Sequence, residues 1–346
     1  MDIKKMVGKN IASLKAYQAK EIPCRVKLDA NESPYGFPEA FKILKGVKTN
    51  RYPDPEAMAL KKLIAKESGV RPENILQGNG SDELIYYLIT TFGGPVLYPT
   101  PTFSMYGIIS QALNEKRVEV SLDGEFDLAV KPILSAIRKE KPGLIFLSSP
   151  NNPTANCFST DRILKIMESA SKSIVVVDEA YQPFASARGF IPMLGDYENL
   201  VIMRTLSKIG LAALRVGFLI GSEEIINEVN KVRLPFNLNA LSQTVALKAL
   251  EDKGLMRQYV KSIISERKKL FKELSNIKDI VVYPSEANFI LFKVQDADGV
   301  YQSLLKKGVL VRNMKGAVDG CLRVTVGTQE ENRIFIRALK NTSIEG

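Results

Sequence analysis

The sequence predicts an α/β fold in which helices flank a mainly parallel sheet in a large domain, joined to a smaller α+β domain. From about residue 55 to residue 245, short apolar runs alternate with amphipathic stretches. Nearly continuous apolar runs are typical of parallel strands whose two faces are both covered by helices. Beyond that region, a long helical stretch is followed by shorter strand-like runs. With 346 residues, the chain is long enough for two packed domains.

Six apolar runs are the expected strands of the large domain. They are NILQG (74–78), GPVLYP (94–99), GLIFLSSP (143–150), SIVVVDEA (173–180), NLVIMRT (199–205) and RVGFLIG (215–221). The stretches with helical spacing between them are SDELIYYLITTF (81–92), LAVKPILSAIRKE (128–140) and STDRILKIMESASK (159–172). Ligands of such sheets bind at the carboxyl ends of the strands. The polar residues that follow these runs are therefore candidate site residues.

The alternation of strand-like and helical stretches ends near residue 245, and we place a domain boundary there. Residues 240–277 have helical spacing with an interruption near Gly254, and the strand-like runs DIVVYPS, NFILFKV, GVLVRNM and CLRVTVG follow. The first 45 residues are broken by proline and cannot form a domain alone. We therefore expect a large domain over 46–244, and a small domain made of 245–346 and of 1–45, which includes an N-terminal arm.

The composition argues against several classes of protein. The formal net charge is +10, but the basic clusters are mixed with acids at helical spacing, so we expect no nucleic-acid site. No apolar run approaches the roughly 20 residues of a membrane span and the charged N-terminus has no signal core, which predicts a cytoplasmic protein that binds no membrane. Three scattered cysteines form neither a disulfide framework nor a metal knuckle. The lack of any histidine excludes Ser–His–Asp and Cys–His catalysis and histidine-ligated metals, and we expect no metal site.

The stretch QGNGSDELI combines a strand end, a glycine turn and a helix start. Gly78 and Gly80 permit close approach of the backbone, and Ser81 stands at the expected N-cap. Free amides at a helix N-terminus bind anions. However, Glu83 stands where a dinucleotide-binding motif has its third glycine, and no P-loop lysine follows. By itself, the stretch is also typical of an ordinary capped turn.

Three other stretches place chemically capable side chains after strand-like runs. Lys208 lies between hydroxyl residues in RTLSKIGLAALRVGFLIG, Asp178 ends the run IVVVD, and Asn152 lies in SSPNNPT. Each residue alone has an ordinary alternative, such as a helix cap or a turn. Together they offer an amine, an acid for a ring nitrogen and an anion cradle, which are the groups that pyridoxal phosphate requires.

These residues belong to a series of motifs in which the chain resembles the aminotransferases of fold type I, and among them the histidinol-phosphate aminotransferases. The motifs span nearly the whole chain. They are LKAYQ, LDANESPYG, RYPDP, GNGSDELI, PTFSMY, SPNNPT, VVVDEAY, RTLSK, LRVGF, PFNLN, NFIL, VRN and CLRVTVGTQEENRIFIRAL. The resemblance implies a homodimeric transaminase, an enzyme that depends on pyridoxal 5'-phosphate.

The resemblance also implies roles for residues around the cofactor, of which Lys208, Asp178 and Tyr181 are the catalytic ones. Lys208 matches the lysine that binds the cofactor covalently, and Asp178 matches the partner of its ring nitrogen. Asn152 and Tyr181 match ligands of the ring hydroxyl. The remaining matches are a phosphate cup of Gly80, Ser81, Asp82, Thr205, Ser207 and Arg215, a stacking aromatic at Phe103, and Tyr52, which reaches the cofactor phosphate of the other subunit.

Four positions match residues that bind the substrate. Arg323 matches an arginine that clamps the substrate carboxylate or the corresponding group of an amino alcohol, and Asn31 belongs to the same set. Tyr17 and Arg312 match positions associated with a substrate phosphate. The expected reaction transfers the amino group of histidinol phosphate to 2-oxoglutarate, which gives imidazole acetol phosphate and glutamate, in histidine biosynthesis.

Other functions remain open at this point. An aromatic amino acid aminotransferase or a phospho-amino-acid decarboxylase would use the same fold and cofactor. A non-enzymatic binding protein, such as a basic nucleic-acid-binding module, would leave the lysine–acid–phosphate set without a use.

Two positions depart from the family's usual pattern. Ala155 stands in place of the usual glycine after NPT, which costs about 1 kcal/mol if φ is positive there. The segment between Lys208 and Arg215 is one residue shorter than the commoner form, which bears on the placement of Arg215.

Overall fold

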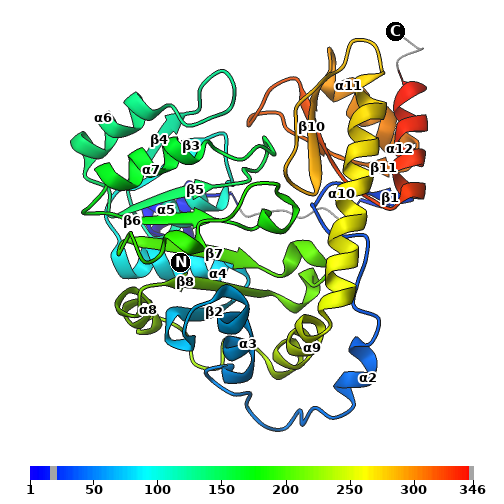
Figure 1. Cartoon of the computed structure of the whole chain (residues 1–346). Helices are drawn as coiled ribbons and strands as arrows, with labels where there is room; N and C mark the ends of the chain where they lie inside the picture. Colours follow the sequence, from blue (N-terminus) through cyan, green and yellow to red (C-terminus); the bar gives the residue numbers. More distant parts are fainter. Residues whose placement is uncertain (16–21, 343–346) are drawn as a thin grey trace.

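The computed structural model describes residues 1–15 and 22–342, and its centre is a seven-stranded sheet (Figure 1). The strand order is β2-β8-β7-β6-β5-β3-β4. The bounds are β2 (Ile75–Asn79), β3 (Val96–Thr100), β4 (Arg117–Ser121), β5 (Leu144–Ser148), β6 (Ile174–Asp178), β7 (Leu200–Thr205) and β8 (Val216–Gly221). Only β8 runs antiparallel to its neighbours in this sheet. The predicted mainly parallel sheet is confirmed, and each of the six expected strands is present.

Helices cover both faces of this sheet. One face packs against α4 (Ser81–Phe92), α5 (Met105–Ala112) and α8 (Glu223–Asn230), and the other against α3 (Met58–Ser68), α6 (Val130–Glu140), α7 (Thr160–Ser169) and α9 (Ala240–Glu251). In β5, Phe146 lies in the first core, whereas Ile145 and Leu147 lie in the second, and all three are fully buried. Burial on both faces explains why this strand reads as a continuous apolar run.

Two local features differ from the sequence-based expectations. Strand β4 is not among the predicted strands, because it is an edge strand whose sequence, RVEVS, carries charges and has a largely exposed pattern. The predicted N-cap at Ser81 is wrong, since Ser81 is the first helical residue of α4 and Gly80 is the cap. Gly80 has φ of +83°, a conformation that glycine adopts without steric cost.

A second, antiparallel sheet lies beside the first, and the long helix α10 runs next to it (Figure 1). Its order is β12-β13-β10-β9. The elements of this part are α10 (Lys253–Ser275), β9 (Val281–Val282), β10 (Phe289–Lys293), α11 (Ala297–Lys306), β12 (Arg312–Asn313), β13 (Cys321–Thr325) and α12 (Gln329–Lys340). The helical stretch breaks at Asp252, which caps α10 and lies two residues before Gly254, so the expected interruption near Gly254 is confirmed. The domain limits of 46–244 stay a prediction.

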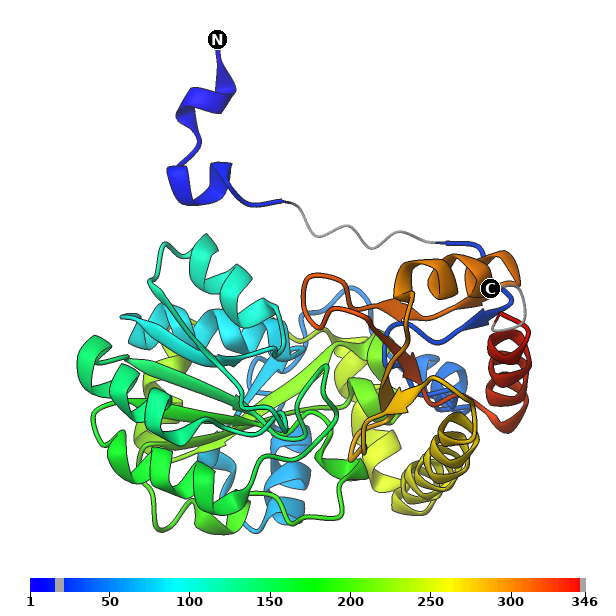
Figure 2. The same ribbon diagram turned by 90° about the horizontal axis from the view of Figure 1, so that it is seen from above.

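The N-terminal residues contact both parts of the molecule, and their first segment forms a separate arm (Figure 2). Val26 of β1 (Val26–Lys27) pairs in parallel with Val309 of β11 (Val309–Leu310). Asn10, in α1 (Lys9–Ala12), donates a hydrogen bond of 2.9 Å to the carbonyl of Ala112 in α5. The other short elements are η1 (Ile3–Met6), α2 (Ala40–Leu44), η2 (Pro72–Asn74), η3 (Gln182–Phe184), η4 (Ile191–Met193), η5 (Ser207–Ile209) and η6 (Ala212–Leu214).

Ala155 has the backbone conformation for which a glycine would be expected. Its φ is +67° and its side chain is fully buried in the core of the second sheet. The conformation costs about 1 kcal/mol relative to glycine. The buried methyl group contributes about 0.8 kcal/mol in return. The two terms nearly cancel, so alanine is tolerated at this position.

Arg267 of α10 joins the two parts of the fold, and its removal is expected to destabilise the chain. The buried guanidinium donates hydrogen bonds to the carbonyls of Phe184 (3.1 Å) and Ala287 (2.8 Å). Arg267→Leu leaves both acceptors unpaired, so the free energy of unfolding in urea should fall by about 2–4 kcal/mol. The exposed neighbour Lys268 provides the control, because Lys268→Leu should change it by less than about 0.5 kcal/mol. Equal effects of the two substitutions would contradict this account of Arg267.

Candidate active site

The carboxyl ends of β5, β6 and β7 open into a cavity of about 370 Å³ that gathers most of the predicted site residues. The predicted residues that line it are Ser81, Asp82, Phe103, Asn152, Asp178, Tyr181, Thr205, Ser207, Lys208 and Arg215. They come from separate stretches of the chain, and the parallel strands bring them to one edge of the sheet. A larger cavity of about 530 Å³ shares only Thr205 with this one.

Asp178 ends β6 with its carboxylate buried at the bottom of the site. One carboxylate oxygen accepts a hydrogen bond from the Ala180 amide (3.0 Å), and the other accepts one from the Tyr106 hydroxyl (2.5 Å). Burial raises the pKa of Asp178 to about 6, although these two donors and the charge of Lys208 act in the opposite direction. Burial and the Asp178 charge also raise the pKa of Tyr106 well above its usual value, so its phenol stays a donor. A cationic group placed beside the Asp178 carboxylate would be stabilised by its negative charge.

Lys208 presents its amine to the same cavity from a tight turn, η5. Its Nζ lies 5.6 Å from the ring centroid of Tyr181. In the described part of the chain, no carboxylate lies within ion-pair distance of this amine. The turn ends at Gly210, with φ of +107°, where a Cβ would lie 2.5 Å from the carbonyl oxygen of Tyr35. The backbone therefore fixes the position of an amine that is free to react.

Hydroxyl groups, a guanidinium group and a helix N-terminus form an anion cradle on one side of the cavity. Arg215 places Nη1 3.4 Å from the Ser207 hydroxyl and Nη2 3.3 Å from the Asp82 carboxylate. The Thr205 hydroxyl accepts a hydrogen bond of 3.1 Å from the Ser207 amide. Gly80 has φ of +83°, and a Cβ there would lie 2.4 Å from Arg215 Nη2, so a side chain at this position would displace the guanidinium group. Such a cradle suits a phosphate group.

Asn31 and Arg323 are joined to the cavity through side chains that line it. Asn31 donates a hydrogen bond of 2.9 Å to the Tyr181 hydroxyl. Arg323 donates to the side-chain oxygen of Asn152 and, over 2.8 Å, to the carbonyl of Asp29. Because β1, β11 and β13 hold these residues near the end of β6, the second sheet contributes directly to the site.

Besides Gly80, Asn31 and Arg323, which border the cavity as described above, the predicted residues Arg312 and Tyr52 are not among those that line it. Arg312 is exposed on β12 and stands directly opposite Arg323 in the antiparallel register. Tyr52 is 81% exposed and stacks on Phe236 at 4.6 Å between ring centroids. Tyr17 lies outside the described residues. A single chain therefore does not bring Tyr52 or Arg312 to the Lys208 amine.

Tyr106 is a site residue that the sequence-based interpretation missed. It is fully buried on α5 and donates to the carboxylate of Asp178. Its sequence signal was its place in the motif PTFSMY beside Phe103, which precedes α5 and whose ring lies 5.7 Å from the Tyr106 ring. Among the described residues, no cluster of three or more acidic or cysteine side chains could hold a metal ion. The same residues include no helix that is long and apolar enough to cross a membrane.

The groups present fit pyridoxal 5'-phosphate in their chemistry. The amine of Lys208 can bind an aldehyde, the buried carboxylate of Asp178 can pair with a protonated ring nitrogen, and the cradle around Arg215 can hold a phosphate. Gly217 lies so close to Gly80 that a Cβ on Gly217 would be 2.9 Å from the Gly80 backbone. Because Gly217 has no side chain, these two backbone segments can both lie beside the cradle.

Known proteins are similar to this chain in sequence and in fold. The family described as aminotransferase class I and II matches residues 17–339. The histidinol-phosphate aminotransferase of Thermoanaerobacter pseudethanolicus is 42% identical over 98% of this chain and 99% of its own length. That of Aquifex aeolicus is 44% identical over 97% of this chain and 98% of its own length.

Solved structures agree with these relatives. The histidinol-phosphate aminotransferase from Clostridium acetobutylicum has a TM-score of 0.85 at 25% identity, over 93% of this chain and 100% of that one. The enzyme from Sinorhizobium meliloti, in complex with pyridoxal-5'-phosphate, has a TM-score of 0.87 at 22% identity, over 97% of both chains, and this likeness concerns the fold. The predicted resemblance and fold type are confirmed, and the chain belongs to the aminotransferase class I and II family.

Proposed function

We propose that the chain is a pyridoxal 5'-phosphate-dependent aminotransferase that transfers the amino group of histidinol phosphate to 2-oxoglutarate in histidine biosynthesis. The observation that carries this proposal is one cavity that combines the Lys208 amine, the buried Asp178 carboxylate and an anion cradle. The names of relatives that are 42% and 44% identical over nearly the whole chain support the choice of substrate.

The residues of the chain divide the work of the reaction. When bound, the cofactor supplies an electron sink for the substrate carbon that carries the amino group. Asp178 keeps the proton on the ring nitrogen, and its burial beside Tyr106 keeps water from screening that charge pair. Lys208 holds the cofactor at rest. The same amine, when it is not bound to the cofactor, would accept the proton of the substrate carbon and return it.

Other residues orient the ring and its phosphate. Asn152 and Tyr181 bind the ring hydroxyl, and their orientation is set by Arg323 and Asn31, which are hydrogen-bonded to them. Phe103 stacks on the ring, and Thr205, Ser207 and Arg215 hold the phosphate with the amides at the start of α4. Fixing the ring in this way keeps the reacting carbon within reach of the single amine.

A pair of arginines supports the choice of a phosphorylated substrate. Arg312 and Arg323 stand directly opposite each other in neighbouring antiparallel strands, so their side chains leave the sheet on the same face. Two guanidinium groups on one face of the sheet can donate to two anionic or polar groups of one substrate. We assign Arg323 to the end of the substrate near the amine and Arg312, with Tyr17, to its phosphate.

An exposed apolar patch supports a homodimer. Tyr52 (81% exposed), Leu234 (63%), Phe236 (39%) and Leu241 (43%) present large side chains to solvent on one chain. Tyr52, Phe236 and Leu241 line one surface hollow, in which the first two stack on each other. Contiguous apolar surface of this kind is typical of a contact between subunits. We propose that Tyr52 reaches the cofactor phosphate of the partner from this patch.

The raised pKa of Asp178 predicts a pH dependence of stability in the cofactor-free chain. The folded chain keeps this proton up to about pH 6, whereas the unfolded chain loses it near the usual aspartate pKa of 3.8. The folded state therefore binds more protons in this interval, and stability falls as pH rises through it. Relative to Asp178→Asn, the wild type should lose about 2 kcal/mol between pH 4 and pH 6.5. Urea unfolding at both pH values measures the difference. If the free energy of unfolding changed equally with pH in the two proteins, Asp178 would not be the group that titrates.

The role of Arg312 predicts a selective loss of activity. Arg312→Leu removes a charged donor to the substrate phosphate, worth about 1.5–3 kcal/mol, so kcat/KM for histidinol phosphate should fall roughly 10- to 150-fold. The value for histidinol, which lacks the phosphate, should barely change. Lys315→Leu is the matched control, because Lys315 is exposed nearby and pairs with Asp298. Wild-type protein that turns over neither substrate would refute the proposed function, whereas equal losses for both substrates would remove only Arg312 from its role.

The shared site predicts that two inactive variants restore each other. A dimer of Tyr52→Phe and Lys208→Ala subunits has one site with both defects and one with neither. Equal mixing makes about half of the dimers mixed by random pairing, so activity should recover to about a quarter of the wild type. A mixture of Lys208→Ala with Asp178→Asn is the control, since both residues belong to one subunit's site and no intact site forms. Proven subunit exchange without recovery would place Tyr52 outside the partner's site.

A further inference from the structure

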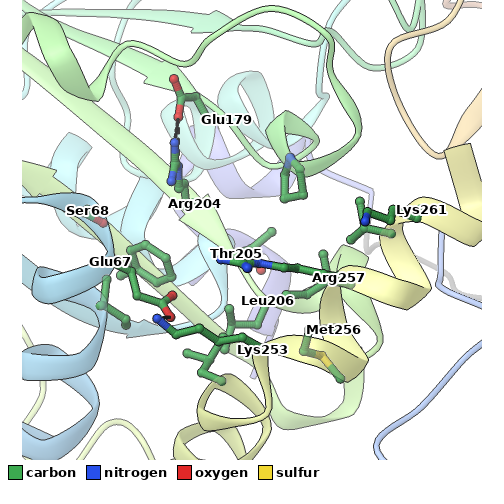
Figure 3. A pocket seen from close by; sticks show the side chains of 16 residues that line it. Glu67, Ser68, Glu179, Arg204, Thr205, Leu206, Lys253, Met256, Arg257 and Lys261 are labelled. Atoms are coloured by element: carbon green, nitrogen blue, oxygen red, sulfur yellow. Dashed lines mark hydrogen bonds and ion pairs between the residues drawn. The ribbon is translucent and has the colours of Figure 1, made fainter.

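A second cavity, of about 530 Å³, is lined by Glu179 and Arg204, the neighbours of Asp178 and Thr205 (Figure 3), and the proposed reaction does not use it. Residues of α3, α9 and α10 enclose it together with the ends of β7 and β8. Its volume is within the range of about 300–1,000 Å³ that is usual for small-molecule sites. It shares only Thr205 with the Lys208 cavity, and the Thr205 hydroxyl is bonded to Ser207 on that side. The two cavities are therefore separate.

The inner wall of this cavity is apolar. Ile64 of α3, Leu206, Phe218 of β8 and Met256 of α10 line it, and each of them is largely buried. A bound molecule would replace water against these side chains, which favours a ligand with an apolar body. A sugar or another strongly hydrated molecule would find few partners there.

Four cationic side chains also line the cavity, and two of them are already paired. Arg204 donates from Nε (2.8 Å) and Nη2 (2.7 Å) to the fully buried carboxylate of Glu179. Lys253 lies 3.0 Å from the carboxylate of Glu67, as Figure 3 shows. These two pairs close two sides of the cavity without leaving a net charge.

The other two cations, Arg257 and Lys261, have no such partner. Across residues 1–15 and 22–342, no carboxylate lies within 4.0 Å of either group. They stand four residues apart on α10, so they share one face of the helix and repel each other. Arg257 extends from α10 across the cavity (Figure 3). An anion held by both groups would remove this repulsion, so the cavity has the charge of an acid-binding site.

We propose that this cavity binds a small amphipathic anion: an apolar body of one or two rings that carries a single carboxylate, sulfonate or phosphate group. Arg257 and Lys261 hold the acid group, and the body packs against Met256 and Phe218. The ligand lies between β7 and α10. The site is independent of the substrate proposed above, because it uses none of the residues that hold the cofactor or the substrate apart from the backbone side of Thr205.

Fluorescence of 8-anilinonaphthalene-1-sulfonate tests the proposal on the cofactor-loaded enzyme. This probe is an amphipathic anion of the proposed class, and the chain contains no tryptophan to interfere with it. The double variant Arg257→Gln/Lys261→Gln should raise the dissociation constant at least tenfold. The double variant Lys268→Gln/Lys272→Gln is the matched control, because it removes two exposed cations with the same spacing from the same helix outside the cavity. It should change the constant by less than twofold.

A neutral probe checks that the cavity itself is intact. N-phenyl-1-naphthylamine has the same rings without the sulfonate, and it should bind the wild type and Arg257→Gln/Lys261→Gln equally. Unchanged binding of the sulfonate to Arg257→Gln/Lys261→Gln would overturn the proposal, as would an equal loss in both double variants. A parallel loss of the neutral probe would overturn it as well, because the effect would then not concern charge. None of these outcomes depends on which amine the enzyme accepts.

Discussion

The alternation of side chains at the ends of β6 and β7 is the constraint on which the site depends. Asp178 and Thr205 line the Lys208 cavity, whereas their neighbours Glu179 and Arg204 line the cavity on the other side. Glu179 is fully buried, so its charge is tolerable only because Arg204 binds it through two nitrogen atoms. This ion pair ties the two strand ends together, and with them the carboxylate and the turn that carry the chemistry.

The antiparallel strand β8 closes the site in a way that parallel strands alone could not. It returns the chain from the Lys208 turn to β2, where Val216 pairs with Asn79. Arg215 thereby arrives beside the N-terminus of α4, in a left-handed conformation with φ of +54°. Gly80 and Gly217 lie so close together that a Cβ on Gly217 would clash with the Gly80 backbone. Because neither residue has a side chain, two stretches that are far apart in the sequence can form one anion cradle.

Much of the fold and of the site could be predicted from the sequence, because the signals were local. Continuous apolar runs marked β5 and β6, and each functional stretch followed such a run. Features that depend on pairing were out of reach. The edge strand β4 has charged residues, the position of Arg312 opposite Arg323 follows from strand register, and Tyr106 reaches Asp178 only through the packing of α5. The second cavity forms between elements that are far apart along the chain, so no sequence motif could predict it.

The burial of Asp178 also makes proton release from this site simple to measure. Histidine is the side chain that ordinarily titrates between pH 5 and pH 8, and this sequence contains none. Burial brings the pKa of Asp178 to about 6, into that otherwise quiet interval. Below about pH 6, where this carboxyl keeps its proton, a cation that enters the site and pairs with the carboxylate displaces that proton. Calorimetry in buffers of different ionisation enthalpy can therefore count the occupation of the site as released acid, without any optical label.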